Sequence, residues 1–408
     1  MQMGTRERFL RCMRFEPVSR PPNFELGYWG QTLKRWFREG MPREAYPWDY
    51  LDKRVMKSGH VAMRRGVRGY EPAMSEVEFL TEPGPLYGHG YFGIESRPCL
   101  PLRLGPMPSF KVRVFEETDR YTLYRDREGR LRKALRVGTV RGTRMSMDTY
   151  LDFPVKGRED FEKMKERYDP HDPRRYPPNW PQIVEHYRER DVPLCLVPNG
   201  GVGFYSLARQ WMGTEGVSKA FFTKASLVHD MMDFIADFTM EVTHKALHDV
   251  RPDYFNFFED FAHKGGPHFS PRIFKEFVLP RYRRVTEFMR EHGVDIIWLD
   301  SDGNIEVLIP LLIEAGITCI WPLEAAAGMD SQKIRREHGD DLALSGGIDK
   351  REIAKGKKAI KREVMSKVPE LVAEGGYIPT LDHSFPPDIP YENFLFYLKV
   401  KLKAMTSD

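Results

Sequence analysis

Acidic side chains recur at the ends of short apolar runs in the second half of this sequence. The clearest case is "DIIWLDSDGN" (295–304), where an unbroken apolar run is followed by Asp300, Ser301 and Asp302. Such a run is typical of a strand buried on both faces. Other runs end in Asn199-Gly200-Gly201, Glu259-Asp260, Glu324, Asp349 and Asp382-His383. If the runs are parallel strands, these groups meet at one edge of the sheet, where mutual repulsion raises the pKa of some carboxylates unless a cation is present.

Three of these residues are our candidates for catalysis, namely His383, Asp300 and Glu259. Asp300 falls at the very end of its buried run, and Glu259 follows the aromatic stretch "YFNFF", so both acids emerge from an apolar wall. His383 lies in "DHSFPPDIP", where prolines keep the chain out of a helix. Histidine titrates near neutral pH, and an acid with a raised pKa keeps its proton there, so the set is suited to acid–base catalysis.

The same positions also have structural explanations. An acid directly after a strand is often the N-cap of the following helix, and Asp302 and Asp349 fit that role as well as a functional one. A single loop histidine is more often structural than catalytic. The basic run "KREIAKGKKAIKREVMSK" is most simply a helix face in solvent.

Aromatic and polar residues elsewhere are candidates to bind a substrate. We expect most of the tryptophans to lie in the core, with some lining a pocket for an apolar or planar ligand. The substrate-binding candidates are Tyr28, Trp29, Asn199, Trp321 and Asp349.

The alternation of sequence patterns along the chain predicts an α/β fold. From about residue 191, short apolar runs alternate with helical patterns, which indicates βα units and a parallel sheet. No GxGxxG or GxxxxGK[ST] motif supports a nucleotide-binding open sheet, so we expect a (β/α)8 TIM-type barrel. Residues 1–180 are expected to form an N-terminal extension with a β-hairpin in "VFEETDRYTLYRDREGRLRKALRVG" and the first barrel strand or strands, "RPPNFELGYWG" being one candidate. Residues 181–408 would form the main part of the barrel, in one compact domain overall.

Composition excludes several classes of protein. The 408 residues carry 63 Lys and Arg against 59 Asp and Glu, a net charge of +4 that predicts neither nucleic-acid nor membrane binding. The 4 cysteines have no metal-site or disulfide spacing and are expected to be reduced thiols. The charged N-terminus lacks the apolar core of a signal peptide, and the apolar runs are too short to cross a bilayer, so a cytoplasmic protein is expected.

Most of the chain resembles the uroporphyrinogen decarboxylase superfamily, which includes zinc-dependent, corrinoid-linked methyltransferases. The resemblance is carried by "SLARQWMGTEGV", by residues 257–304, by "SGGIDKREIAKGKKAI" and by "GGYIPTLDHSFPPDIPYENFLFYL". It implies a (β/α)8 barrel. The zinc enzymes have His-x-Cys where this chain has Asp300-Ser301-Asp302, and Cys where it has His383. A divalent metal would therefore meet Asp300, Asp302 and His383, a set that zinc, manganese or iron tolerates.

The resemblance implies a corrinoid-linked methyltransferase (demethylase) that acts on a small methylated compound. The corrinoid would come on a partner protein, because the chain has no DxHxxG segment. The alternative is a decarboxylase of a small carboxylic acid, since His383 resembles a histidine of the decarboxylase. The decarboxylase's arginine signature is absent, and an acidic rim would repel the eight carboxylates of porphyrinogen. A binding or scaffold protein without chemistry is the third possibility. Family members are often dimers, so a homodimer is a further expectation.

Overall fold

The computed structural model describes residues 3–42, 45, 90–135, 148–198 and 200–406. The α-helices are α1 (Thr5–Met13), α2 (Gly30–Arg38), α5 (Arg158–Lys165), α6 (Trp180–His186), α7 (Phe204–Thr223), α8 (Ala225–Val250), α9 (Pro271–Ile273), α10 (Leu279–Glu291), α11 (Ile309–Glu314), α12 (Ser331–His338), α13 (Lys350–Ala354), α14 (Lys357–Met365), α15 (Val368–Ala373) and α16 (Tyr391–Met405). The short 3₁₀ and π helices are η3 (Gly90–Phe92), η4 (Pro173–Arg175), η5 (Phe274–Val278), η6 (Glu306–Leu308), η7 (Ala325–Ala327) and η8 (Gly339–Asp341). The strands are β1 (Arg113–Glu117), β2 (Tyr121–Arg125), β3 (Leu131–Leu135), β4 (Thr149–Asp152), β5 (Tyr254–Phe258), β6 (Ala262–His263), β7 (Gly266–Pro267), β8 (Ile296–Asp300), β9 (Cys319–Trp321), β10 (Ala343–Ser345) and β11 (Tyr377–Ile378).

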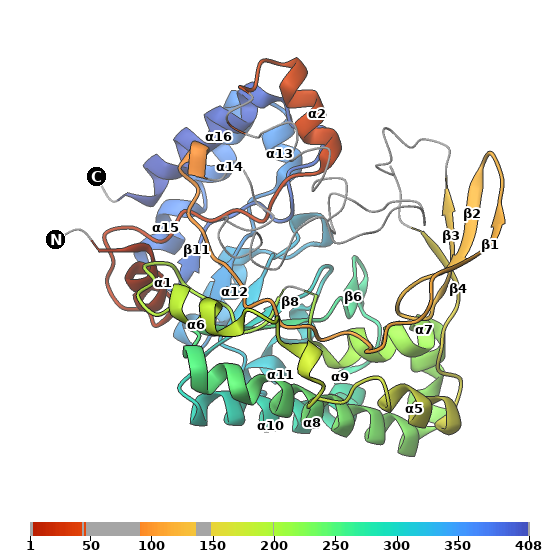
Figure 1. The fold of residues 1–408 in the computed structure, drawn as a ribbon. Coiled ribbons are helices and arrows are strands. Elements are labelled where there is room, and N and C mark those ends of the chain that lie inside the picture. Colours follow the sequence, from red (N-terminus) through yellow and green to blue (C-terminus); the bar gives the residue numbers. More distant parts are fainter. Residues whose placement is uncertain (1–2, 43–44, 46–89, 136–147, 199, 407–408) are drawn as a thin grey trace.

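A parallel sheet forms the centre of the molecule, with helices packed around it (Figure 1). Its five strands run in the order β11-β10-β9-β8-β5, and every neighbouring pair is parallel. Single parallel bridges continue the pairing from Tyr254 to Cys195 and on to Cys99, and another joins Tyr28 to Phe385. The predicted α/β class with a parallel sheet is confirmed, whereas closure into an eight-stranded barrel stays a prediction.

Alternate residues of the parallel strands point to two different cores. One set, which includes Trp298 and Trp321, packs with Phe9 and Cys12 of α1. The other set packs under the surrounding helices, for example Ile297 and its neighbours in the larger cluster. Because side chains alternate along a strand, Asp300 points to the same side as Trp298, the side that α1 covers at the amino end.

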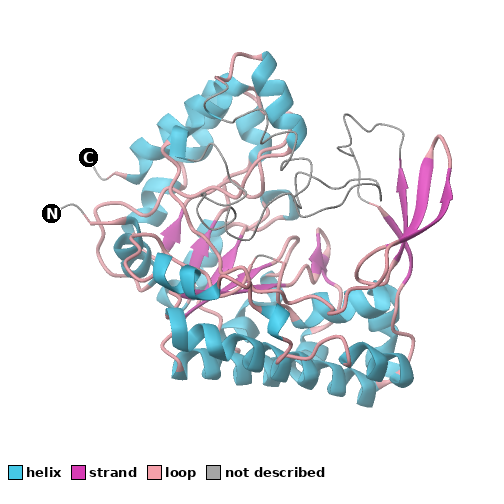
Figure 2. Cartoon of the chain, viewed as in Figure 1, coloured by secondary structure: helices cyan, strands magenta, loops and turns pink. Residues whose placement is uncertain are grey.

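A second, antiparallel sheet stands away from the parallel one at the edge of the molecule (Figure 2). Its strands follow the order β1-β2-β3-β4, and β2 and β3 form a hairpin around Asp126 and Arg130. Asp126 Oδ1 accepts hydrogen bonds from the backbone N–H groups of Glu128 and Arg130, at 3.1 and 2.8 Å, which fixes the turn. The predicted hairpin is therefore present, extended by a strand on each side.

A fully buried ion pair fastens the C-terminal helix to the N-terminal segment. Lys401 of α16 and Glu25 are both 0% exposed in their side chains, and Lys401 Nζ donates to Glu25 Oε1 at 2.5 Å and to the Phe24 carbonyl at 2.9 Å. The same carboxylate accepts from the Tyr397 hydroxyl at 2.6 Å and from the Leu381 N–H at 3.0 Å. These contacts hold residues 24–25 beside the segment that follows β11. No helix in the described ranges is long and apolar enough to cross a membrane.

Candidate functional site

Charged groups gather at the carboxyl ends of the parallel strands, where electrostatic interactions connect them. This rim cluster consists of Asp260 after β5, Asp302 after β8, Glu324 after β9, Lys350 after β10, and Asp382 and His383 after β11. The first four residues come from four different connections between a strand and the next helix, and Asp382 and His383 both come from the connection after β11. The predicted convergence of acids from separate strand ends is thus present in the structure.

Asp302 has the properties of an acid that keeps its proton near neutral pH. Burial, followed by repulsion from Asp260 and Glu324, raises its pKa to about 7, and Lys350 opposes this rise. Its side chain is 44% exposed, so repulsion by the neighbouring carboxylates must account for much of the effect. The group can therefore be reached from solvent and can donate a proton at pH 7.

The capping explanation for Asp302 is wrong. The following short helix begins at Glu306, and the side chain of Asn304 accepts the hydrogen bond of the Glu306 N–H at 3.1 Å. Asp302 is left facing the rim cluster, where its Oδ2 lies 3.7 Å from His383 Nε2. That distance is too long for a direct hydrogen bond.

Lys350 supplies a positive charge to the rim cluster. Its Nζ lies 3.3 Å from Asp382 Oδ2 and 3.7 Å from Glu324 Oε1. Asp382 is completely buried and also accepts backbone hydrogen bonds from Ala325 and Lys350, both at 3.1 Å. Lys350 opens the basic run that the sequence assigns to a solvated face, and its position next to the strand end β10 was the signal that could have identified it.

His383 is neutral at the pH where Asp302 titrates. Burial, and then the positive charge of Lys350, lower its pKa below the ordinary value. The ring of Trp29, at the start of α2, lies 6.4 Å from the His383 ring between centroids. Among the described residues, the buried Nε1 of Trp29 has no hydrogen-bond partner. The structure therefore brings together His383, Asp302 and Trp29 from the predicted set.

Asp260, which follows Glu259, is a site residue that the sequence prediction missed. Its backbone φ is +39°, an unfavourable value for a residue with a side chain. Its Oδ2 accepts a hydrogen bond from Arg209 of α7 at 3.0 Å. Adjacent residues at a strand end point in different directions, so sequence alone could not decide which of the two acids faces the rim.

Glu259 lies behind the strand ends instead, with 0% exposure. Its carboxylate accepts hydrogen bonds from the N–H groups of Phe204 and Ser206, at 2.6 and 3.0 Å, and from the Tyr282 hydroxyl at 2.5 Å. These contacts hold the first turn of α7, and the Glu259 N–H donates to the Asp300 carbonyl at 2.7 Å. They are the contacts of a positioning residue, and the catalytic role predicted for Glu259 stays a prediction.

Glu259 should also make the stability of the protein depend on pH. Burial raises its pKa from 4.5 to about 7, so its contribution to stability is complete below pH 4.5 and is lost as the pH rises through 7. We expect the free energy of unfolding of the wild type to fall by about 2–3 kcal/mol more over this range than that of Glu259→Gln, which cannot ionise. Denaturant titrations of both proteins at several pH values would measure the difference. If the free energies of unfolding of the two proteins changed equally with pH, the pH dependence could not be assigned to Glu259.

Asp300 and Trp321 pair across β8 and β9, so their side chains share one face of the sheet. Asp300 is 7% exposed, and Trp321 is 3% exposed with its Nε1 donating to Asn256 Oδ1 at 2.9 Å. Tyr28 is also 3% exposed and packs against Phe385, at 5.6 Å between ring centroids, in an aromatic core. Asn199 lies outside the described residues.

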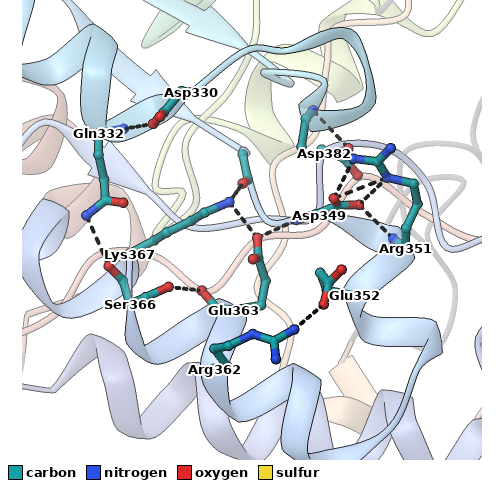
Figure 3. Close-up of polar contacts among 12 residues, drawn as sticks. Asp330, Gln332, Asp349, Arg351, Glu352, Arg362, Glu363, Ser366, Lys367 and Asp382 are labelled. Atoms are coloured by element: carbon teal, nitrogen blue, oxygen red, sulfur yellow. Dashed lines mark hydrogen bonds and ion pairs between the residues drawn. The ribbon is translucent and has the colours of Figure 1, made fainter.

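Asp349 performs the capping role. Its Oδ1 accepts from the Arg351 N–H at 2.8 Å at the start of α13, and its Oδ2 pairs with Arg351 Nη2 at 2.7 Å. Figure 3 shows the two side chains facing each other beside Asp382. Burial tends to raise the pKa of Asp349, but the bonds from Arg351 lower it overall. A carboxylate so engaged positions α13, which starts with Lys350.

Gly303 allows the loop after β8 to pack closely on the β6–β7 hairpin. Its φ is +81°, and a Cβ atom would lie 2.6 Å from the carbonyl carbon of Ala262 and from the backbone nitrogen of His263. Its N–H donates to Glu324 Oε2 at 3.1 Å. This contact fixes the position of the adjacent Asp302.

Replacing Gly303 with alanine should therefore cost more than the same change at Gly293. Gly293 has a similar φ of +84°, but a Cβ there would have nothing within 4 Å. The backbone clash should make Gly303→Ala less stable than Gly293→Ala by about 1–3 kcal/mol. Thermal or urea unfolding of the two variants measures the difference in stability. Equal stabilities would show that the β6–β7 hairpin moves to accommodate the added Cβ atom.

A metal site is the prediction with the least geometric support. Within the described part of the chain, no group of three or more His, Cys, Asp or Glu side chains is arranged to hold a metal ion. Asp300, Asp302 and His383 do not form such a group, so the zinc site stays a prediction and no chemistry below is derived from it.

Comparisons with known proteins agree with this architecture. The family model for uroporphyrinogen decarboxylase (URO-D) matches residues 147–400. Among solved structures, a methyltransferase from Methanosarcina mazei is similar over 98% of this chain and 99% of its own, with a TM-score of 0.60 and 14% sequence identity. At that identity the likeness concerns the fold. No curated protein sequence matches the chain. Because the family model covers more than half of the sequence, the chain belongs to the uroporphyrinogen decarboxylase family.

Proposed function

We propose that this protein is a corrinoid-linked methyltransferase (demethylase) that removes a methyl group from a small methylated compound. The observation that carries the proposal is Asp302, a solvent-reachable carboxyl group with a pKa of about 7 in the rim cluster. An ether or amine is a poor leaving group, and proton donation at the moment of bond cleavage removes that obstacle. The overall likeness to a methyltransferase supports the same reaction class.

Asp302 would donate its proton to the oxygen or nitrogen that loses the methyl group. The carbon–heteroatom bond breaks, its electron pair stays on the heteroatom, and the proton from Asp302 goes to that atom. Asp302 is 44% exposed and would recover its proton from solvent between turnovers, next to a neutral His383 whose Nε2 lies 3.7 Å away. Lys350 compensates Glu324 and Asp382, and its positive charge limits the rise in the pKa of Asp302, which makes the proton easier to donate. A corrinoid on a partner protein would supply the nucleophile that accepts the methyl group.

The proposal is tested with free cob(I)alamin as methyl acceptor. Purified protein is incubated with a panel of small methoxylated and N-methylated compounds, and formation of methylcobalamin is followed by its absorbance. At least one compound should lose its methyl group only when protein is present. Demethylation of none, with the wild type correctly folded, would overturn the proposal.

A decarboxylase of a small carboxylic acid is the second candidate. A protonated Asp302 beside a neutral His383 is also what a carbanion needs for protonation after loss of CO₂. Release of labelled CO₂ from carboxyl-labelled acids, with no methyl transfer in the first assay, would favour this alternative. The pKa shifts of several groups in one cluster favour either enzyme over a scaffold protein.

A further inference from the structure

We infer that Arg97 is an anion-binding group beneath the rim cluster, and that the methylated substrate carries one oxyanion group, a carboxylate or a sulfonate. The inference rests on the proposed function and narrows its class of substrate. It starts from an arginine that no part of the reaction above uses.

Arg97 lies among aromatic rings on the inner side of the parallel sheet. Its guanidinium carbon is 4.7 Å from the centre of the Trp321 ring, 5.5 Å from that of Trp298 and 5.7 Å from that of Phe24. Rings at this distance hold the planar guanidinium in place by cation–π attraction. They also provide an apolar wall on which a flat organic group can rest.

Among the described residues, Arg97 forms no ion pair with a carboxylate. Over the described ranges, its Nε is buried without a hydrogen-bond partner, and none of the ion pairs formed there includes it. Its polar neighbour is the hydroxyl of Tyr254, which stays neutral because burial raises its pKa. A neutral hydroxyl does not compensate the guanidinium charge.

Two buried arginines elsewhere in the chain show what a purely structural role requires. Arg175 donates to the carbonyls of Arg103, Gly105 and Arg167, among others. Arg335 likewise donates to the carbonyls of Gly339, Leu342, Gly375 and Gly376. Arg97 makes no such set of bonds in the part of the chain that the structure describes, so its donors remain available to a ligand.

Its position relative to the rim cluster suits a small substrate. Arg97 rests on Trp321, whose strand partner is Asp300, and Asp302 follows two residues later. Two residues of extended chain span at most about 7 Å. We therefore expect Arg97 to lie close enough to Asp302 for one molecule to place an oxyanion on the first and its methylated heteroatom near the second.

Charge balance favours a single anionic group. Lys350 and Arg209 compensate part of the rim cluster, and a protonated Asp302 removes a further negative charge. Arg97 adds a positive charge beneath the cluster, on the face of the sheet that also carries Asp300. A ligand with many carboxylates would still be repelled by the remaining acids.

The test is direct binding, measured by calorimetry without any methyl acceptor. The probes are benzoate, benzenesulfonate and the uncharged benzyl alcohol. The wild type should bind at least one of the two anions more tightly than benzyl alcohol, and the tighter anion identifies the oxyanion class. Arg97→Gln should weaken that binding about tenfold or more, because a charge-assisted bidentate contact is lost. Arg336→Gln, on the exposed side of α12, makes the same charge change and should have no effect.

Arg97→Lys keeps the charge without the planar fork, so its affinity should fall between those of the wild type and Arg97→Gln. If Arg97→Gln does not fold, Arg97→Lys still tests the inference. Equal binding of benzoate and benzyl alcohol by the wild type would overturn the inference, as would anion affinities that neither variant changes. These binding measurements need no methyl transfer, so they test the inference even if the methyl-transfer assay fails. A failure to bind anions would, in turn, leave the result of the methyl-transfer assay unaffected.

Discussion

Replacing Asp302 with asparagine should lower the rate of methyl transfer by about 10²–10⁴-fold, the usual contribution of a positioned general acid. Asparagine has nearly the same shape and keeps hydrogen-bonding groups, but it has no acidic proton to give. Asp302 makes no helix cap, and its side chain is 44% exposed, so the change should leave stability almost unaltered. The rate is measured with cob(I)alamin and whichever compound proves to be a substrate. Asp341→Asn, an exposed acid on the surface, is the matched control and should retain full activity.

The pH profile gives this prediction a second readout. Since the pKa of Asp302 is about 7 and its protonated form is the active one, the wild-type rate should decrease as the pH rises above 7. The residual rate of Asp302→Asn should not show that decrease. A variant with wild-type activity, or with the same alkaline limb, would remove Asp302 from the mechanism and leave the acid role to another group.

Lys401→Met should be the most damaging single change to stability, with a loss of about 3–5 kcal/mol in the free energy of unfolding. Methionine fills a similar volume, but the substitution leaves Glu25 as an uncompensated charge in a fully buried place. The lost bonds to Phe24 and Glu25 also loosen α16 from the N-terminal segment. Guanidinium chloride denaturation, followed by circular dichroism, measures the effect.

Two further variants isolate the ion pair from other effects. Lys399→Met changes an exposed lysine of the same helix and should alter the free energy of unfolding by less than about 0.5 kcal/mol. Adding Glu25→Gln to Lys401→Met removes the stranded charge and should recover part of the loss. If the double variant is less stable than Lys401→Met alone, packing or the hydrogen bond from Tyr397 outweighs the buried charge.

The apolar runs predicted the central strands well because burial on both faces leaves a strong trace in sequence. The runs that contain Phe257, Leu299, Ile320 and Leu344 are β5, β8, β9 and β10, and the acids follow them as expected. The run "PLCLVPNGG" was less successful. It forms only a bridge at Cys195, since Pro193 and Pro198 have no N–H groups to lengthen the pairing.

Which acid caps a helix and which acid faces the rim cluster could not be predicted, because this depends on contacts between residues that are distant in sequence. Asp349 and Asp302 look alike as candidate caps, yet only Asp349 meets the N–H groups of a helix start. Glu259 and Asp260 are neighbours, but the first meets α7 and Tyr282 while the second faces the rim. Lys350 reaches its acids from a run in which Lys357, Lys358 and Lys361 are exposed to solvent.

The packing of α1 has a consequence for the order of events in a reaction cycle. Phe9 and Cys12 seal the amino end of the inner face of the sheet, and the Cys12 thiol contacts the Tyr377 carbonyl at 3.5 Å. Because α1 covers this end, we expect a molecule that binds Arg97 to approach from the side of the rim cluster, where Asp302 is 44% exposed. If the corrinoid protein of the proposed function docks over the same strand ends, the methylated compound has to bind before it, and the demethylated product has to leave after it.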